Sequence, residues 1–346
     1  MNTSVDLAND ALLRERVTQY LSRQSDRAIE VLELVRLPVG FSWLTFRMTV
    51  RGLTDNAEVR PLILRLGPNY GLFAPYSALP QVLSMQSLAG TAVPVPKVYW
   101  HGDDPAPFGA PFLFCELVTG SALLPWASSS LAPLDDATRV QLAEQFIDAL
   151  AALHELDWSM RPMAQMASEL APENAAGQEL QFWMAQYERW AMRPYPLFEW
   201  GARWLLEHPP IAPRLSIVHG DYRTGNFLEV TGKITSILDW ELAHIGDPHE
   251  DLGWASLPMY MGGTKLICRL VEPDRFFEHY QSRVSFELSM KSVAYYKAFS
   301  LLKLAATHMA AARCFEDGRF NDLRMPAMGS QILPVLRQLE KSIETL

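Results

Sequence analysis

Residues 216–241 read SIVHGDYRTGNFLEVTGKITSILDWE, and they form the most informative part of the sequence. Two apolar runs typical of buried strands flank a polar loop that contains glycine, and a turn at 231–233 leads back into a further apolar run. Asp221, Asn226 and Asp239 stand at strand and loop ends, where their side chains can converge on one point. Because all three offer oxygen and none is cysteine, the set suits a hard cation such as Mg²⁺ rather than Zn²⁺.

The spacing within this stretch is typical of phosphoryl transfer. That reaction needs one carboxylate to orient the attacking hydroxyl and accept its proton, and a second carboxylate with an amide to hold magnesium at the nucleotide phosphates. Protein kinases meet the need with a His-x-Asp-x-x-x-x-Asn loop and an aspartate on the following hairpin. His219, Asp221 and Asn226 reproduce the loop spacing, and Asp239 follows Asn226 by thirteen residues. The alternative is that these residues have a purely structural role, as turn formers and strand caps.

Around the loop, VHGDYRTGNFL (218–228) and ILDWELAHIGDPHEDLGW (237–254) closely resemble the aminoglycoside phosphotransferase (APH)-like kinases. The sequence is most similar to the branch that contains the kinase domains of the acyl-CoA dehydrogenase 10 and 11 proteins. The resemblance covers roughly residues 30–257. It implies an α+β, protein-kinase-like bilobal fold and a small-molecule kinase that uses ATP and Mg²⁺. The expected lobes are a small β-rich N-terminal lobe (1–117), which binds nucleotide, and a larger, mainly helical C-terminal lobe (118–346), with the active-site cleft between them.

The resemblance also implies roles for individual residues. In the C-terminal lobe, Asp221 is expected to be the catalytic base, and Asn226 and Asp239 the magnesium ligands. Asp247 and Asp251 are expected to brace the loop rather than to touch substrate. The implied nucleotide contacts are three residues over the phosphates, one cation at the α- and β-phosphates, and backbone groups that meet adenine at the hinge between the lobes: Gly40, Phe41, Ser42, Arg65, Glu116 and Val118.

One feature departs from the family pattern. The phosphate-binding cation is usually paired with a glutamate on the next helix, but the chain contains no glutamate between Val59 and Cys115. The helix expected at 78–88 offers only Gln81 and Gln86. Either backbone or glutamine holds Arg65, or a carboxylate arrives from elsewhere. Two other functions therefore stay open: a pseudokinase or nucleotide-binding module, and a magnesium-dependent phosphohydrolase.

Hydrophobic periodicity predicts the remaining elements. Strand-like runs occupy 31–37, 43–50, 60–66 and 112–117, and amphipathic helices are expected at 6–23, 78–88, 137–155, 178–206, 274–282, 287–313 and 329–344. Asp135 or Asp136 can cap the helix at 137–155. His154, near the end of that helix, and His219 are expected to be structural histidines. His244 and His249 lack enough neighbouring ligands to propose a metal site.

Composition limits the function further. A net charge of −9 argues against a nucleic-acid or anionic-membrane partner, and three scattered cysteines indicate neither a disulfide framework nor a zinc site. The start of the sequence lacks a signal-peptide pattern, and no apolar run approaches 18 residues, so a cytoplasmic location is expected. The oligomeric state is left open. Phe182, Trp183, Tyr187 and Trp190 suggest an apolar or aromatic alcohol as acceptor, and the family branch suggests hydroxyacyl compounds, including hydroxyacyl-CoA.

Overall fold

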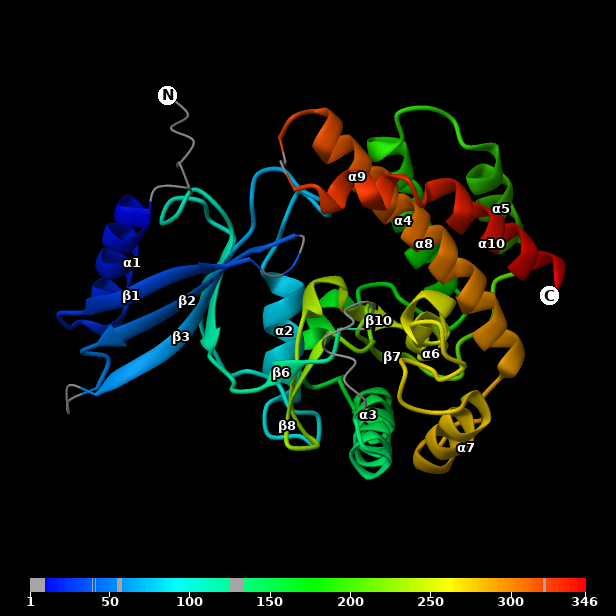
Figure 1. The fold of residues 1–346 in the computed structure, drawn as a ribbon, viewed down its shortest axis with the longest axis horizontal. Helices are drawn as coiled ribbons and strands as arrows, with labels where there is room; N and C mark the ends of the chain where they lie inside the picture. Colours follow the sequence, from blue (N-terminus) through cyan, green and yellow to red (C-terminus); the bar gives the residue numbers. More distant parts are fainter. Residues whose placement is uncertain (1–9, 39, 41, 55–57, 125–133, 320–321) are drawn as a thin grey trace. The chain divides into compact units, whose positions relative to one another are not determined.

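The computed structural model describes residues 10–38, 40, 42–54, 58–124, 134–319 and 322–346 (Figure 1). The chain divides into two compact units, the first made of Met1–Val82 and Pro96–Leu117, and the second of Leu83–Val95 and Val118–Leu346. The boundary falls within helix α2 (Leu79–Leu88). Among the described residues, no helix is both long enough and apolar enough to cross a membrane.

The first unit is a five-stranded antiparallel sheet covered by one helix. The strands lie in the order β1-β2-β3-β5-β4, and their bounds are Glu30–Leu37, Leu44–Arg51, Val59–Leu66, Phe112–Glu116 and Val98–Gly102 in that order. Helix α1 (Asp10–Ser25) buries Leu13, Val17 and Leu21 in the core of the sheet, because these residues recur on one face of the helix. Aromatic side chains from β5 and the loop before it complete this core.

The second unit is mainly helical. Helix α8, 27 residues long, packs against α4, α6, α9 and α10 (Figure 1). Asp135 caps α3 by accepting a hydrogen bond from the Thr138 N–H at 2.9 Å, so the predicted cap is confirmed. The helices of this unit are α3 (Asp136–Glu155), α4 (Ala175–Trp190), α5 (Pro196–Glu207), α6 (His249–Ala255), α7 (Pro273–Arg283), α8 (Met290–Glu316), α9 (Arg324–Gly329) and α10 (Ile332–Glu344).

Two small antiparallel sheets in the second unit position the polar loop of residues 219–226. One pairs β7 (Ser216–Val218) with β10 (His244–Gly246), and the other has the order β6-β8-β9, with bounds Ser121–Ala122, Phe227–Val230 and Lys233–Ile237. The β8–β9 hairpin turns at Thr231 and Gly232, both in the left-handed region, where glycine is favoured. A sheet-based first unit and a mostly helical second unit confirm the predicted α+β class.

Candidate active site

The loop of residues 219–226 connects β7 to β8, and Asp239 follows the end of β9. Phe227 pairs with Ile237 in the β8–β9 hairpin, and just beyond this pair the Leu238 N–H donates to the Asn226 carbonyl at 2.7 Å. Residues 226 and 239 therefore lie on neighbouring backbone segments at the same end of one hairpin. Asp239 has left-handed backbone angles (φ 68°, ψ 51°), which aspartate tolerates better than most residues.

The carboxylate of Asp221 is held by four N–H groups. Arg223 donates from Nε to Oδ1 at 2.8 Å and from Nη2 to Oδ2 at 3.0 Å. Trp254 donates from Nε1 to Oδ1 at 2.7 Å, and Asn226 donates from Nδ2 to Oδ2 at 2.6 Å. Each oxygen thus accepts two hydrogen bonds, so the carboxylate has a fixed orientation.

The side-chain amide of Asn226 is also oriented. Its Nδ2 donates both to the Asp221 carboxylate and to the Asp221 backbone carbonyl, the latter at 2.9 Å. Because the amino group makes both bonds, the amide oxygen points to the opposite side, where it can serve as a ligand for a hard cation. The side chains of Asp221 and Asn226 therefore contact each other, and the β8–β9 hairpin brings the backbone of Asp239 close to that of Asn226.

His219 is a structural histidine, as predicted. Its Nε2 lies 2.9 Å from the Leu238 carbonyl, and its Nδ1 accepts from the Asp221 N–H at 3.1 Å. Burial lowers the pKa of His219, which favours the neutral ring that this bonding pattern needs. The histidine thereby ties the loop to the chain segment that carries Asp239.

Asp251 braces the loop from α6. Its carboxylate accepts from the backbone N–H groups of His219 at 2.7 Å and Gly220 at 2.9 Å, and it also contacts His154 Nε2 at 3.2 Å. His154 in turn contacts the Tyr280 hydroxyl at 2.7 Å, so it is the core histidine that the sequence indicated. The carboxylate of Asp247 instead accepts from the backbone N–H and the ring Nδ1 of its neighbour His249.

Gly220 is required by the backbone at this point. Its φ is +80°, and a Cβ atom there would lie 2.6 Å from the Leu242 carbonyl oxygen. Any side chain would therefore displace the chain beside the loop.

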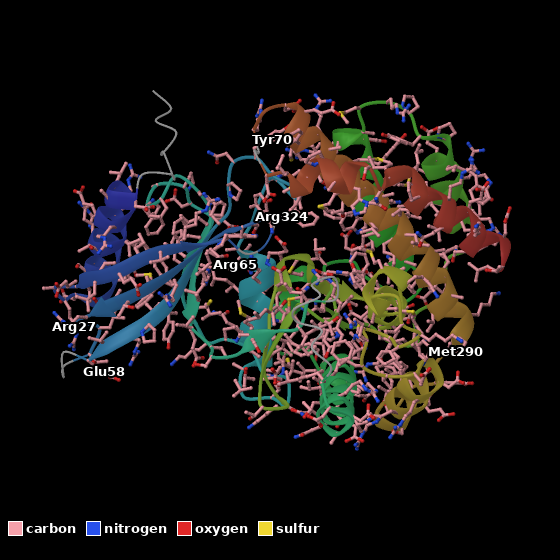
Figure 2. All side chains as sticks on the ribbon, in the orientation of Figure 1. Arg27, Glu58, Arg65, Tyr70, Met290 and Arg324 are labelled. Carbon is pink, nitrogen blue, oxygen red and sulfur yellow. The ribbon has the colours of Figure 1, made fainter. Side chains whose placement is uncertain are left out.

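In the first unit, Arg65 lies on β3, where it is labelled in Figure 2. Its Nη1 donates to Gln81 Oε1 at 2.6 Å, and its guanidinium lies 5.7 Å from the ring centroid of Trp43. The missing glutamate is thus replaced by a buried glutamine on α2, one of the alternatives that the sequence left open. A neutral acceptor orients the arginine without cancelling its charge.

On the expectation that Arg65 contacts the nucleotide phosphates, we predict that Gln81→Leu raises the KM for MgATP by about 10-fold, because it removes a hydrogen bond that helps to orient this charged group. The expected change in kcat is smaller. Steady-state kinetics with varied MgATP measures both constants. Gln86→Leu is the matched control, since Gln86 lies on the same helix and is exposed. Equal KM values for the two variants would contradict the assigned role of Gln81.

The other residues that the resemblance implies as nucleotide contacts differ in burial, and they belong to both units. Gly40 is exposed with φ +80°, Ser42 is buried, and Phe41 lies outside the described residues. Glu116 is the last residue of β5, and its backbone N–H already donates to the Lys97 carbonyl at 2.9 Å. Val118 is half-buried and belongs to the second unit.

The aromatic residues proposed for the acceptor mostly pack inside the second unit. Trp183 and Trp190 are buried, and Tyr187 stacks on Phe198 with ring centroids 4.1 Å apart. Phe182 is 45 % exposed and is the member of the set that can meet another molecule directly. Most of these aromatic side chains therefore pack within the second unit.

Sequence reasoning did not find Arg223, Trp254 or Lys303. Arg223 and Trp254 bond the Asp221 carboxylate directly, and Lys303 on α8 donates from Nζ to the Gly220 carbonyl at 2.7 Å. The position of Arg223, two residues after Asp221, was the available signal. Trp254 and Lys303 reach the loop through packing of α6 and α8, which no local pattern reveals.

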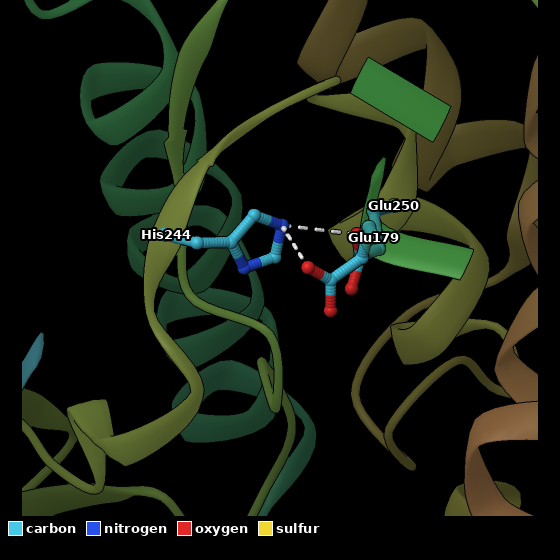
Figure 3. Close-up of side chains that lie close together, drawn as sticks. All are labelled: Glu179, His244 and Glu250. Atoms are coloured by element: carbon cyan, nitrogen blue, oxygen red, sulfur yellow. Dashed lines mark ion pairs between the residues drawn. The ribbon is translucent and has the colours of Figure 1, made fainter. Parts of the chain in front are cut away.

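A second cluster of ionisable side chains lies beside the loop. His244 Nε2 is 3.2 Å from Glu250 Oε2 and 3.7 Å from Glu179 Oε2 (Figure 3). Glu250 also pairs with Lys303 Nζ at 2.9 Å. Burial would lower the pKa of His244, but the charges of Glu179 and Glu250 raise it to about 10. Two cations thus balance two carboxylates, which describes an ion-pair network rather than a metal centre.

The raised pKa of His244 predicts a pH-dependent stability. The stabilisation by protonated His244 is complete below its ordinary pKa of about 6.5 and is lost as the pH rises through about 10. We expect the difference in unfolding free energy between wild type and His244→Gln to shrink by on the order of 3 kcal/mol over this window. Urea denaturation of both proteins at pH 6, 8 and 9.5 measures it. A difference that is constant with pH would contradict the charged His244.

The sheet-based first unit, the helical second unit and the Asp221 loop with its following aspartate define a small-molecule kinase of the protein-kinase-like fold. The chain belongs to the phosphotransferase enzyme family (APH), whose family model matches residues 34–273, more than half of the chain. The predicted family resemblance is therefore confirmed.

Known relatives agree with this assignment. The chain is 28 % identical to acyl-CoA dehydrogenase family member 10 of Mus musculus over 213 residues, which are 61 % of this chain and 19 % of that protein. It is 27 % identical to family member 11 of Homo sapiens over 175 residues, which are 50 % of this chain and 22 % of that protein. The chain thus spans about a fifth of the length of these relatives.

Solved structures show the same fold. A putative aminoglycoside phosphotransferase from Ralstonia eutropha JMP134 superposes with a TM-score of 0.73 at 23 % identity, covering 96 % of this chain and 98 % of that one. A thermostable mutant of aminoglycoside phosphotransferase APH(4)-Ia, in a ternary complex with AMP-PNP and hygromycin B, gives a TM-score of 0.55 at 16 % identity, with 95 % and 98 % covered.

Proposed function

We propose that the protein transfers the γ-phosphoryl group of MgATP to a hydroxyl group of a small molecule, with Asp221 as the base. The observation that carries this proposal is the contact between Asp221 and Asn226, together with the backbone bond that brings Asp239 close to Asn226. Asn226 bonds the Asp221 carboxylate at 2.6 Å, and its backbone carbonyl accepts from Leu238, the residue before Asp239. The three residues thus combine a base and two hard oxygen donors within one loop and one hairpin.

In the proposed reaction, the hydroxyl oxygen forms a bond to the γ-phosphorus while the bond to the oxygen that bridges to the β-phosphate breaks. The hydroxyl proton passes to the Asp221 carboxylate, and ADP leaves. Phosphoryl transfer has a loose transition state, so positioning contributes more than the strength of the base. The four hydrogen bonds to Asp221 support a role that depends on positioning more than on base strength, since they fix the direction in which the carboxylate oxygens face.

Asn226 and Asp239 would hold the magnesium ion. Their donors are an amide oxygen and a carboxylate, which Mg²⁺ prefers, and the amide of Asn226 is already turned by its two bonds to Asp221. When bound, the ion would neutralise charge on the nucleotide phosphates.

The nucleotide contacts form part of the same proposal. Arg65, oriented by Gln81, would meet the phosphates together with Gly40, Phe41 and Ser42, and backbone groups of Glu116 and Val118 would meet adenine. The AMP-PNP complex of the aminoglycoside phosphotransferase neighbour supports ATP as the phosphate donor. The hydrogen bond between Arg65 and Gln81 supports a working phosphate contact despite the absent glutamate.

For the acceptor, we propose an uncharged or apolar alcohol, and hydroxyacyl compounds, including hydroxyacyl-CoA, as the first class to test. Two observations support this choice. The relatives that match over half of the chain or more are named acyl-CoA dehydrogenase family members. In addition, the exposed Phe182 provides an apolar surface on α4.

A screen of purified protein tests the proposal. MgATP is incubated with a panel of hydroxyacyl-CoAs and hydrophobic alcohols, and phosphorylated product is detected by mass spectrometry. Transfer to an acceptor by wild type and not by Asp221→Asn supports the kinase. Phosphate release that needs only water would identify a phosphohydrolase instead. Nucleotide binding without transfer to any member of the panel would indicate a nucleotide-binding module.

A further inference from the structure

Lys303 is a buried lysine whose ammonium group contacts the main chain of the catalytic loop. It lies in the middle of α8, is 1 % exposed, and donates from Nζ to the Gly220 carbonyl at 2.7 Å. That carbonyl belongs to the peptide unit that joins Gly220 to Asp221. The N–H of the same peptide unit donates to His219 Nδ1 at 3.1 Å. Lys303 and His219 therefore hold the two sides of the peptide that carries the proposed base.

This restraint matters because of the residue at its centre. Gly220 has φ +80°, and glycine can rotate to other backbone conformations at little steric cost. Asp251 fixes the N–H groups of His219 and Gly220, which lie before the rotatable bonds of Gly220. The Gly220 carbonyl lies after them, and Lys303 is the side chain that holds it.

The same ammonium group also lies against a second support of Asp221. Lys303 Nζ is 5.0 Å from the ring centroid of Trp254 and 5.2 Å from that of Trp183. Trp254 donates its indole N–H to Asp221 Oδ1. Lys303 thus contacts both the peptide that precedes Asp221 and a ring that bonds the Asp221 carboxylate.

The charge of Lys303 is balanced inside the second unit. Glu250 accepts from Nζ at 2.9 Å and also faces His244, which in turn faces Glu179 (Figure 3). Burial would lower the pKa of Lys303, but Glu250 and Glu179 outweigh it and raise the pKa overall. Burial would likewise raise the pKa of Glu250, but the positive charges of Lys303 and His244 outweigh burial and lower this pKa overall. Both partners are therefore charged.

A buried ion pair of this kind is a poor source of stability. Removing two charges from water costs about as much as their attraction returns, and well-packed apolar residues often do as well or better. An apolar residue at position 303 would suit the two flanking tryptophans. Only a donor, however, can hold the Gly220 carbonyl.

We infer that Lys303 is a positioning residue for phosphoryl transfer, which acts by holding the Gly220–Asp221 peptide and with it the Asp221 carboxylate. Glu250 supplies the balancing charge that lets this lysine stay buried. The inference rests on the proposed function for its kinetic consequence, but its structural part, the restraint on the loop, can be measured separately.

The test separates charge balance from positioning. Lys303→Met removes one of the two cations of the cluster and leaves Glu250 and Glu179 facing His244 alone, so both the melting temperature and the kcat of this variant are expected to fall. Lys303→Met/Glu250→Gln removes both charges and keeps the pair of His244 with Glu179. Its melting temperature is expected to recover, whereas kcat stays about 100-fold below wild type, because a displaced base costs rate even when the fold is intact. The KM for MgATP is expected to change by less than about 3-fold, because the nucleotide contacts are elsewhere.

Lys291→Met is the matched control, since Lys291 lies on the same helix and is exposed. Amide exchange is followed in parallel in fragments that cover residues 219–222, and it is expected to be faster in the double variant. If kcat of the double variant recovers together with its melting temperature, the positioning role is wrong. If wild type transfers no phosphate to any acceptor, the proposed function fails, and the exchange experiment alone decides: unchanged exchange at 219–222 overturns the inference, and faster exchange supports it.

Discussion

Asp221→Asn is expected to lower kcat for phosphate transfer by about 1,000-fold, because loss of a positioned general base typically costs 10²–10⁴-fold. Asparagine keeps the size of the side chain but cannot accept the hydroxyl proton. In addition, its amino group faces N–H donors at a position where the wild-type carboxylate has an oxygen that accepts from them. The KM for MgATP is expected to stay within about 3-fold of wild type, since in the proposed mechanism Asp221 contacts the reacting hydroxyl rather than the nucleotide.

Measuring kcat and nucleotide affinity on the same samples separates the base from the fold. Calorimetric titration with MgATP shows whether the nucleotide site is intact, and a thermal melt shows whether the chain is folded. Arg223→Met is a useful companion, because it removes the bidentate partner of Asp221 and leaves the carboxylate itself. If Asp221→Asn loses nucleotide affinity and transfer in equal proportion, Asp221 would be a structural residue and not the base.

Asp239→Asn is expected to raise the magnesium concentration needed for half-maximal rate by on the order of 100-fold, because in the proposed metal site it replaces a charged ligand of a hard cation by a neutral one. The substitution is mild for the backbone, since asparagine also tolerates the left-handed angles of this position. The rate as a function of free Mg²⁺, at a fixed concentration of ATP, gives the measurement.

Glu229→Gln is the control for this prediction. Glu229 lies on β8 of the same hairpin, where its carboxylate accepts from Ser121 and from the Gly232 N–H. It therefore matches Asp239 in charge and belongs to the same hairpin region, but it lies within β8, away from the end of the hairpin at which Asn226 and Asp239 lie. An unchanged magnesium requirement in Asp239→Asn, or an equal shift in Glu229→Gln, would remove Asp239 from the metal site.

The central loop could be predicted from sequence because its geometry is local. Asp221 and Asn226 are five residues apart in one loop, and Asp239 is brought back by a hairpin whose turn is visible at 231–233. For the expected glutamate partner of Arg65, the sequence left backbone, a glutamine of α2 or a carboxylate from elsewhere as alternatives. The structure selected Gln81, which is buried, over Gln86, which is exposed.

Apart from Asp251, which the family resemblance implied, the supports of the loop could not be predicted, because buried charged residues run against the usual rules. His249, Glu250 and Asp251 are consecutive polar residues, which normally indicate a solvent-exposed loop, yet they begin the buried helix α6. Lys303 lies more than eighty residues beyond Gly220 in a helix whose pattern otherwise indicates packing. Buried charges become interpretable only once tertiary structure shows which groups balance them.

The most direct test of the central claim is transfer of radiolabel from [γ-³²P]ATP in the presence of Mg²⁺ to a hydroxyacyl-CoA, measured for wild type and Asp221→Asn prepared side by side. The account predicts a labelled, phosphorylated acyl-CoA with wild type, loss of that label when EDTA removes the magnesium, and a rate about 1,000-fold lower with Asp221→Asn. Equal labelling of the acceptor by the two proteins would contradict it.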